Sequence, residues 1–171
     1  MKTFSRLISA AAVGAALLSA SIAQAATWNW SYSGAGVTAS GTFTTAGNAA
    51  VLEDVLSITG TRNGAPILGL VPPDSDPNYI YDNQFVNGSP YLTEGGWLYD
   101  LGGGGADAHI NIYFDSTDLQ YHDLRLDPLG ASITDTIVTM TVTAVPEAST
   151  YAYMALGLAG MGLAIRRRKA V

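Results

Sequence analysis

The central part of this chain carries its clearest structural signal in the segment VLSITGTRNGAPILGL, residues 55–70. Within it, the pair Asn63-Gly64 separates two stretches rich in β-branched and apolar residues. Asn-Gly is the pair best suited to the positive φ angles of a two-residue β-hairpin turn. The segment therefore predicts a strand that ends near Arg62, a tight turn at Asn63-Gly64, and a returning strand over residues 67–70.

The same β pattern extends toward the N-terminus. Trp28, Trp30 and Tyr32 alternate with polar residues, which places three aromatic side chains on one face of a first strand. Residues 37–44 alternate apolar or small side chains with hydroxyl side chains, so a second strand with a hydroxyl-rich outer face follows a turn at residues 34–36.

Toward the C-terminus the chain keeps this character. Three prolines between residues 72 and 77 predict a loop, because proline cannot lie in a central strand. Between residues 26 and 144, the only helical pattern is a short turn near residues 49–55. Further strands are predicted over residues 79–82, 91–93, 97–101, 108–114, 121–126 and 134–145. Many short strands with Gly- and Pro-rich turns predict an all-β fold, a single β-sandwich or jelly-roll-like domain over residues 26–144.

The charge of this domain excludes one class of partner. Residues 26–144 hold two of the eight Lys and Arg residues and thirteen of the fourteen Asp and Glu residues, a net charge of 2 − 13 = −11. Such a charge repels phosphate backbones, so we predict no nucleic-acid binding. The chain has no cysteine, which excludes disulfides and thiolate chemistry.

The first 25 residues have the pattern of a secretory signal peptide. Lys2 and Arg6 precede an apolar stretch over residues 7–18, and Ala23-Gln24-Ala25 forms an A-x-A cleavage site. Cleavage by signal peptidase is expected between Ala25 and Ala26. A buried N-terminal helix would not explain this order of charged, apolar and small residues.

Residues 145–171 form a different kind of segment. Residues 151–165 carry no charge and are followed by the basic cluster Arg166, Arg167, Arg168 and Lys169. As a helix they would be about 22 Å long, short against a hydrocarbon core of about 30 Å. A buried soluble helix is the alternative, but a terminal block of cations is typical of a stop-transfer segment that keeps the C-terminus in the cytoplasm. We therefore predict a short transmembrane helix in the inner membrane.

The order of parts in this tail carries a resemblance. Val145, Pro146, Glu147 and Ala148, then a Ser/Thr pair, the apolar segment and the basic cluster, resemble the C-terminal sorting signal of PEP-CTERM proteins of Gram-negative bacteria. The resemblance implies that an exosortase, a membrane protease-transpeptidase, processes the tail, so that the chain is transiently anchored and then reaches the cell surface or medium. Such proteins are common in organisms that make exopolysaccharide. Ala148 departs from the proline usual at that position.

The central domain is also similar to a small β domain found in exported PEP-CTERM proteins. The similarity lies in Trp30-Ser31-Tyr32, residues 41–44, residues 58–64 and Asp82-Asn83. These are turn and core residues, so the similarity implies a fold and no activity.

Few residues of the domain suggest catalysis. The glycine run at residues 102–105 lacks a following Lys-Ser or Lys-Thr and predicts a hairpin loop rather than a phosphate cradle. His109 and His122 lie on different predicted strands, and such histidines more often have structural partners than metal or base roles. No Gly-x-Ser-x-Gly pattern occurs. We therefore predict no catalytic residue and no cofactor, with Ca²⁺ as the one candidate.

The candidate Ca²⁺ ligands are aspartates in or beside predicted loops. Asp74, Asp76, Asp115 and Asp118 lead this set, which Asp123 and Asp127 extend. Ca²⁺ takes six to eight oxygen ligands, but the spacing is not that of an EF-hand. Aspartate is also a common turn residue, which is the structural alternative.

Aromatic side chains offer a candidate sugar-binding surface. Trp28, Trp97 and Tyr99 could stack on sugar rings, whereas burial in the core is the alternative. The leading prediction is a non-enzymatic exported surface or extracellular-matrix protein, associated with exopolysaccharide or biofilm. A lectin-like carbohydrate-binding module is the first alternative, and an exported hydrolase is the second.

Overall fold

The computed structural model describes residues 25–47, 50–103, 106–146, 155 and 157–158. The predicted signal peptide with Ala23, the motif residues Glu147 and Ala148, and the basic cluster at residues 166–169 lie outside this part of the chain. Within it, no helix has the length and apolar character needed to cross a membrane.

The described residues confirm the all-β prediction. The described residues between 25 and 146 form ten strands and one 3₁₀ turn: β1 (Ala26–Gly34), β2 (Val37–Thr45), β3 (Leu52–Arg62), β4 (Ala65–Ile67), β5 (Gly69–Leu70), β6 (Gln84–Val86), β7 (Trp97–Asp100), η1 (Ala106–Ala108), β8 (His109–Asp115), β9 (Gln120–Leu126) and β10 (Ser132–Ala144).

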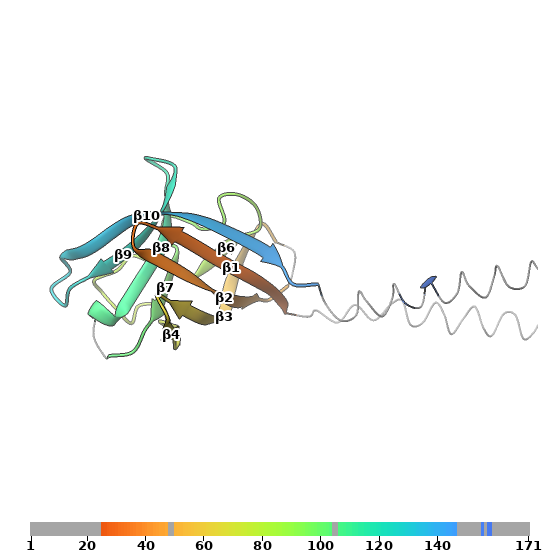
Figure 1. The fold of residues 1–171 in the computed structure, drawn as a ribbon, viewed down its shortest axis with the longest axis horizontal. Helices are drawn as coiled ribbons and strands as arrows, with labels where there is room; N and C mark the ends of the chain where they lie inside the picture. The colour runs from red at the N-terminus through yellow and green to blue at the C-terminus, as the bar shows by residue number, and fades with distance from the viewer. Residues whose placement is uncertain (1–24, 48–49, 104–105, 147–154, 156, 159–171) are drawn as a thin grey trace, which may run out of the picture.

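The strands form one antiparallel sheet in the order β4-β3-β2-β1-β10-β9-β8-β7-β5, with β6 added to β3. Only Leu68 separates β4, which pairs with β3, from β5, which pairs with β7. The two ends of the sheet thus meet in one short stretch of chain, and the sheet is a nearly closed barrel (Figure 1). This up-and-down order differs from the sandwich or jelly roll expected from the sequence.

The Asn63-Gly64 turn is confirmed. Asn63 has a φ of 49° and Gly64 a φ of 82°, the positive values that a two-residue hairpin requires. Beside it, Gly41 of β2 lies opposite Gly60 of β3. A Cβ atom on Gly41 would lie 1.8 Å from the carbonyl oxygen of Thr59, so the close approach of β2 and β3 depends on this glycine.

Aromatic side chains fill the barrel. Trp30, Phe43 and Trp97 are almost fully buried, and the ring centroids of Phe43 and Trp97 are 4.7 Å apart. The alternation predicted for β1 and β2 therefore faces its apolar side inward. Because the interior is packed with side chains, it is a core rather than a ligand cavity.

A second, smaller core lies on the outer face of the barrel. The chain after β5 crosses this face, and Val71 and Tyr79 pack there with Leu98 of β7 and Leu126 of β9. The proline-rich segment is a loop as predicted. This loop carries Asp76, which contacts His109, and Asn78 and Tyr79, which line a pocket described below.

Three secondary-structure predictions are wrong. Residues 79–82 form no strand, because the Asn83 side chain holds this segment by hydrogen bonds to Val71 and Leu98 in place of a ladder. Residues 91–93 make only the single bridge Phe85–Leu92. The helical turn near residues 49–55 is replaced by the start of β3 at Leu52.

Candidate functional site

One polar group lies inside the barrel, among the aromatic side chains. Arg62 donates from Nε and Nη2 to the two carboxylate oxygens of Asp123, at 2.9 and 2.6 Å. The Tyr32 hydroxyl donates to Asp123 Oδ2 at 2.5 Å. Because that hydroxyl has one hydrogen, Tyr99 is the donor in its 2.5 Å contact with Tyr32. The four side chains join β1, β3, β7 and β9.

The electrostatics of this group suit a structural role. Asp123 is fully buried, and the Arg62 side chain is 10% exposed. Burial would lower the pKa of Arg62, but the hydrogen bonds and charge of Asp123 outweigh it and raise that pKa. Burial is the main cause that raises the pKa of Tyr32 and of Tyr99, so both phenols stay protonated. The sequence did not reveal this group.

The interior of the barrel holds residues that were predicted to bind sugar or calcium. Tyr99 and Trp97 have no exposed surface, because β7 turns both side chains into the barrel, so neither can stack on a sugar. Trp28 is half-buried against Phe85, with ring centroids 4.8 Å apart. Asp123, considered as a calcium ligand, is instead the partner of Arg62.

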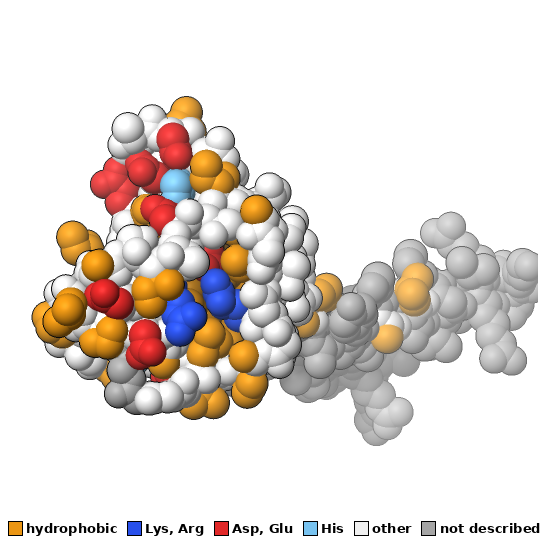
Figure 2. Space-filling view, turned by 60° about the vertical axis from the view of Figure 1, so that its left-hand side comes forward, with side chains coloured by type: hydrophobic (Ala, Val, Ile, Leu, Met, Phe, Trp, Pro, Cys, Tyr) orange, Lys and Arg blue, Asp and Glu red, His pale blue; other side chains and the backbone are white. Residues whose placement is uncertain are grey.

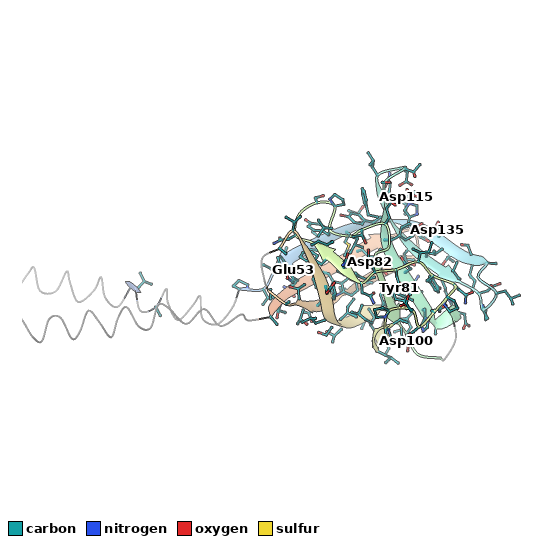
Figure 3. All side chains as sticks on the ribbon, turned by 180° about the vertical axis from the view of Figure 1, so that it is seen from behind. Glu53, Tyr81, Asp82, Asp100, Asp115 and Asp135 are labelled. Atoms are coloured by element: carbon teal, nitrogen blue, oxygen red, sulfur yellow. The ribbon has the colours of Figure 1, made fainter. Side chains whose placement is uncertain are left out.

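An acidic cluster surrounds His122 on the outer face of β9. The ring Nε2 lies 3.0 Å from Asp118 Oδ2, and Nδ1 lies 2.9 Å from Asp135 Oδ1. Asp115 lies close to both His122 and Asp118. Figure 2 shows acidic side chains beside a histidine at one end of the barrel, and Figure 3 labels Asp115 and Asp135.

This cluster sets the protonation of His122. Burial lowers the pKa of the His122 ring, but the hydrogen bonds and charges of Asp135 and Asp118 outweigh burial and raise that pKa above its ordinary value. The imidazolium form donates from both ring nitrogens to carboxylates. We therefore assign the cluster first a structural role at the β8–β9 turn.

The structure also shows how the aspartates predicted as calcium ligands are arranged. Oxygen or nitrogen atoms of Asp115, Asp118 and His122 lie within 4.8 Å of one another, so these three could hold a cation if the His122 ring lost a proton and became neutral. Asp76 lies elsewhere, bonded to His109 at the start of β8, whereas Asp115 ends that strand roughly 20 Å away. The predicted aspartates therefore do not form one site. Calcium binding stays a prediction.

The other loop candidates have local roles. Asp76 is buried, and its carboxylate contacts His109 Nδ1 at 2.7 Å and accepts a hydrogen bond from the Asn78 amide. Asp74 is exposed in the same loop and has a positive φ of 61°. In the glycine run, the Gly102 amide donates to Asp100 at 2.6 Å, and residues 104 and 105 lie outside the described part.

A pocket of about 380 Å³ lies next to the acidic cluster. Its base is formed by Asn111 of β8 and Leu124 of β9, which pair across the two strands. Tyr113 forms one wall and stacks on His122, with ring centroids 5.2 Å apart. Sequence reasoning missed this pocket, because the segments that line it are distant along the chain.

The two ends of the barrel domain lie together. β1 pairs with the second half of β10, from Trp28 opposite Ala144 to Gly34 opposite Val138. Beyond β10, the Val145 amide still donates to the carbonyl of Thr27 at 2.9 Å. The start of β1 and the end of β10 therefore leave the barrel at the same end (Figure 1).

The chain continues from this end directly into a known sorting signal. Residues 144–169 match the PEP-CTERM protein-sorting motif. The chain carries a PEP-CTERM motif. The match begins at the last residue of β10 and includes the predicted motif residues Val145 to Ala148 and the basic cluster that ends at Lys169.

The PEP-CTERM motif is a C-terminal signal for export to the cell surface, and it implies sorting by an exosortase. This confirms the resemblance seen in the tail. The barrel itself adds no further likeness, since comparison with curated proteins and with solved structures gave no match.

Proposed function

We propose that this chain is a non-enzymatic protein of the cell surface or extracellular matrix, sorted by an exosortase and associated with exopolysaccharide or biofilm. The PEP-CTERM motif at residues 144–169 is the observation that carries the proposal. The motif begins at Ala144, the last residue of β10. Processing at any later position of the motif would therefore release or transfer a barrel with all of its strands.

The geometry of the barrel fits a transient anchor. Its two chain ends lie side by side, so a signal peptide before Ala26 and a short membrane helix after Pro146 would both face the inner membrane. The β9–β10 turn would then point away from the membrane. Signal peptidase and exosortase could act at the same end of the domain without unfolding it.

The partners of His122 support a non-catalytic role for that histidine. Both ring nitrogens of His122 contact carboxylates, and His109 Nδ1 contacts the buried Asp76. A general base needs a ring nitrogen directed at substrate. Because carboxylates occupy both ring nitrogens of His122, its contacts favour a structural role for this residue over the hydrolase alternative.

Exchange of one motif side chain tests the proposal. We expect Glu147→Gln to leave a larger, unprocessed chain in the inner membrane of a host with an exosortase, because Glu147 is the one charged residue of the motif before its basic cluster and is, in this proposal, a recognition element. Immunoblots of the membrane and surface fractions would measure this. Glu94→Gln, the same exchange at an exposed glutamate of the barrel, should be processed normally. Equal processing of both variants would contradict the proposal.

A further inference from the structure

Asn63 and Asn87 are the asparagines of this chain that are followed directly by glycine. Such a pair is chemically labile, because the backbone nitrogen of the next residue can attack the carbon of the side-chain amide, and glycine places no Cβ atom in the way. Ring closure requires the asparagine side chain and backbone to rotate until that nitrogen and that carbon meet. The fold therefore decides which of the two pairs reacts.

Asn63 lies in the turn between β3 and β4, and both ends of its side-chain amide are held. Oδ1 accepts a hydrogen bond from the Thr38 amide at 2.8 Å, and Nδ2 donates to the Gly36 carbonyl at 3.1 Å. The backbone amide of Asn63 also donates to the Thr38 carbonyl at 2.8 Å. The pairing of β3 with β4 fixes the backbone on both sides of the turn. Rotation toward the Gly64 nitrogen would break several of these bonds.

Asn87 follows β6 in an exposed loop, and its side chain is not held in this way. Within the described part of the chain, no hydrogen bond joins the Asn87 side chain to another residue. The Gly88 amide donates to the Val86 carbonyl at 2.9 Å, two residues back, which is a single γ-turn bond rather than a strand ladder. Opening that one bond frees the attacking nitrogen, since the side chain is already free to rotate.

We propose that Asn87 is a site of spontaneous covalent modification, and that the fold protects Asn63 from the same reaction. The Gly88 nitrogen loses its proton to hydroxide and forms a bond to Asn87 Cγ. The bond from Cγ to Nδ2 breaks, and Nδ2 takes up a proton from water and leaves as ammonia. Water then opens the resulting cyclic imide at either of its two carbonyl carbons, which gives aspartate or isoaspartate. Water is the only co-reactant.

The products change the end of β6. Either one adds a carboxylate at an exposed position of an already acidic domain. Isoaspartate also adds one methylene group to the main chain, next to the hydrogen bond from the residue 87 amide to the Val51 carbonyl and the pairing of Val86 with Leu52. It should therefore loosen β6 from the start of β3. This inference goes beyond the proposed function, since it concerns the barrel alone and does not depend on processing of the tail.

Peptide mapping of the full chain tests the proposal. The detergent-solubilised protein would be incubated in mildly alkaline buffer made with heavy-oxygen water, which labels only the conversions that occur during the incubation. A parallel sample would be unfolded in guanidinium chloride, with circular dichroism to verify both states. Mass spectrometry of proteolytic peptides then gives the rates of conversion at Asn63 and Asn87 in the folded and the unfolded chain.

We expect folding to slow the conversion of Asn63 by about tenfold or more, because several hydrogen bonds must break before the ring can close. Folding should slow the conversion of Asn87 by no more than a few-fold, since one turn bond opposes it. The ratio of the rates in the two states cancels the effect of neighbouring side chains on each pair. Equal slowing at the two positions, or slowing of Asn87 by tenfold or more, would overturn the proposal.

Melting curves test the expected change at β6. After incubation, the isoaspartyl fraction of the wild-type chain should melt about 2–8 °C lower than the fresh protein, the shift expected from loss of one or two hydrogen bonds in a domain of this size. Asn87→Gln is the matched control, because its longer side chain does not close the five-membered ring, and it should melt unchanged after the same incubation. An incubated wild-type chain that contains isoaspartate at position 87 and melts like the fresh protein would contradict the loosening of β6.

Discussion

Asp123 is a charged residue in an aromatic core, and its carboxylate is paired with the guanidinium of Arg62 at 2.6 Å. A buried charge is tolerated when it is paired and hydrogen-bonded, and removal of one partner leaves the other uncompensated. At the residue scale, this pair is the point where the barrel is most sensitive to substitution. The hydroxyls of Tyr32 and Tyr99 extend the pair across the interior.

We therefore expect Arg62→Met to lower the free energy of unfolding by about 3–5 kcal/mol, because it leaves Asp123 buried without a counterion. Arg125→Met is the control and should cost about 1 kcal/mol, since the half-buried Arg125 donates to the backbone carbonyl of Asp107. Denaturant titration of both variants measures the difference. An equal decrease in the free energy of unfolding of the two variants would show that the buried Arg62–Asp123 pair stabilises the barrel no more than the Arg125 contact does.

His122 gives a second prediction at this scale, for pH. Its folded pKa is raised by Asp135 and Asp118 against the opposing effect of burial. A raised folded pKa means that the stabilisation is complete below the unfolded pKa of about 6.5 and is lost as the pH rises through the folded value. The free energy of unfolding should therefore fall in that window.

His122→Gln should abolish this fall, while His109 remains in both proteins and cancels from the comparison. Denaturant titrations at a series of pH values from about 6 upward, starting near the unfolded pKa, measure the effect. If the wild-type chain and the variant show the same slope, the acidic cluster does not stabilise the charged ring.

At the scale of elements, β2 and β3 depend on two glycines for different reasons. Gly64 has a φ of 82°, and a Cβ atom there would meet no atom within 4 Å. Gly41 instead faces the Thr59 carbonyl at a distance that excludes any side chain. Gly64→Ala should cost roughly 1 kcal/mol from backbone strain alone. Gly41→Ala should cost clearly more, because it separates the two strands.

Thermal unfolding of the two variants measures this difference. Each variant is a control for the other, since both replace one hydrogen with one methyl group. A Gly41→Ala variant as stable as Gly64→Ala would contradict the close approach of β2 and β3.

Elements with local signals could be predicted from the sequence, and others could not. The Asn63-Gly64 turn and the alternation in β1 are local features, and both were predicted. The burial of Trp97 depends on how β7 joins the closing sheet, which no local pattern shows. Arg62 and Asp123 are separated by 61 positions, and Asn111 becomes distinctive only when Ile80 and Gly95 fold over it.

At the scale of the whole molecule, a compact acidic barrel is continuous with a sorting tail. The pairing of β1 with β10 brings the first and last strands of the domain to one end of the barrel, which is the side where the proposed function would place both the signal peptide and the anchor. The sorting signal in the tail could be recognised from the sequence, because its motif, apolar segment and basic cluster follow one another along the chain. The pocket beside Tyr113 could not, because it is assembled from segments that are distant along the chain.

In the proposed function, the tail is a temporary anchor that is removed as the barrel reaches the surface. Mass spectrometry of the protein recovered from the cell surface or medium tests it most directly. We predict a mature chain that begins near Ala26, retains the barrel through Ala144 and lacks the basic cluster at residues 166–169. Recovery of surface chains that still end in Arg166 to Val171 would contradict processing and leave a plain membrane anchor.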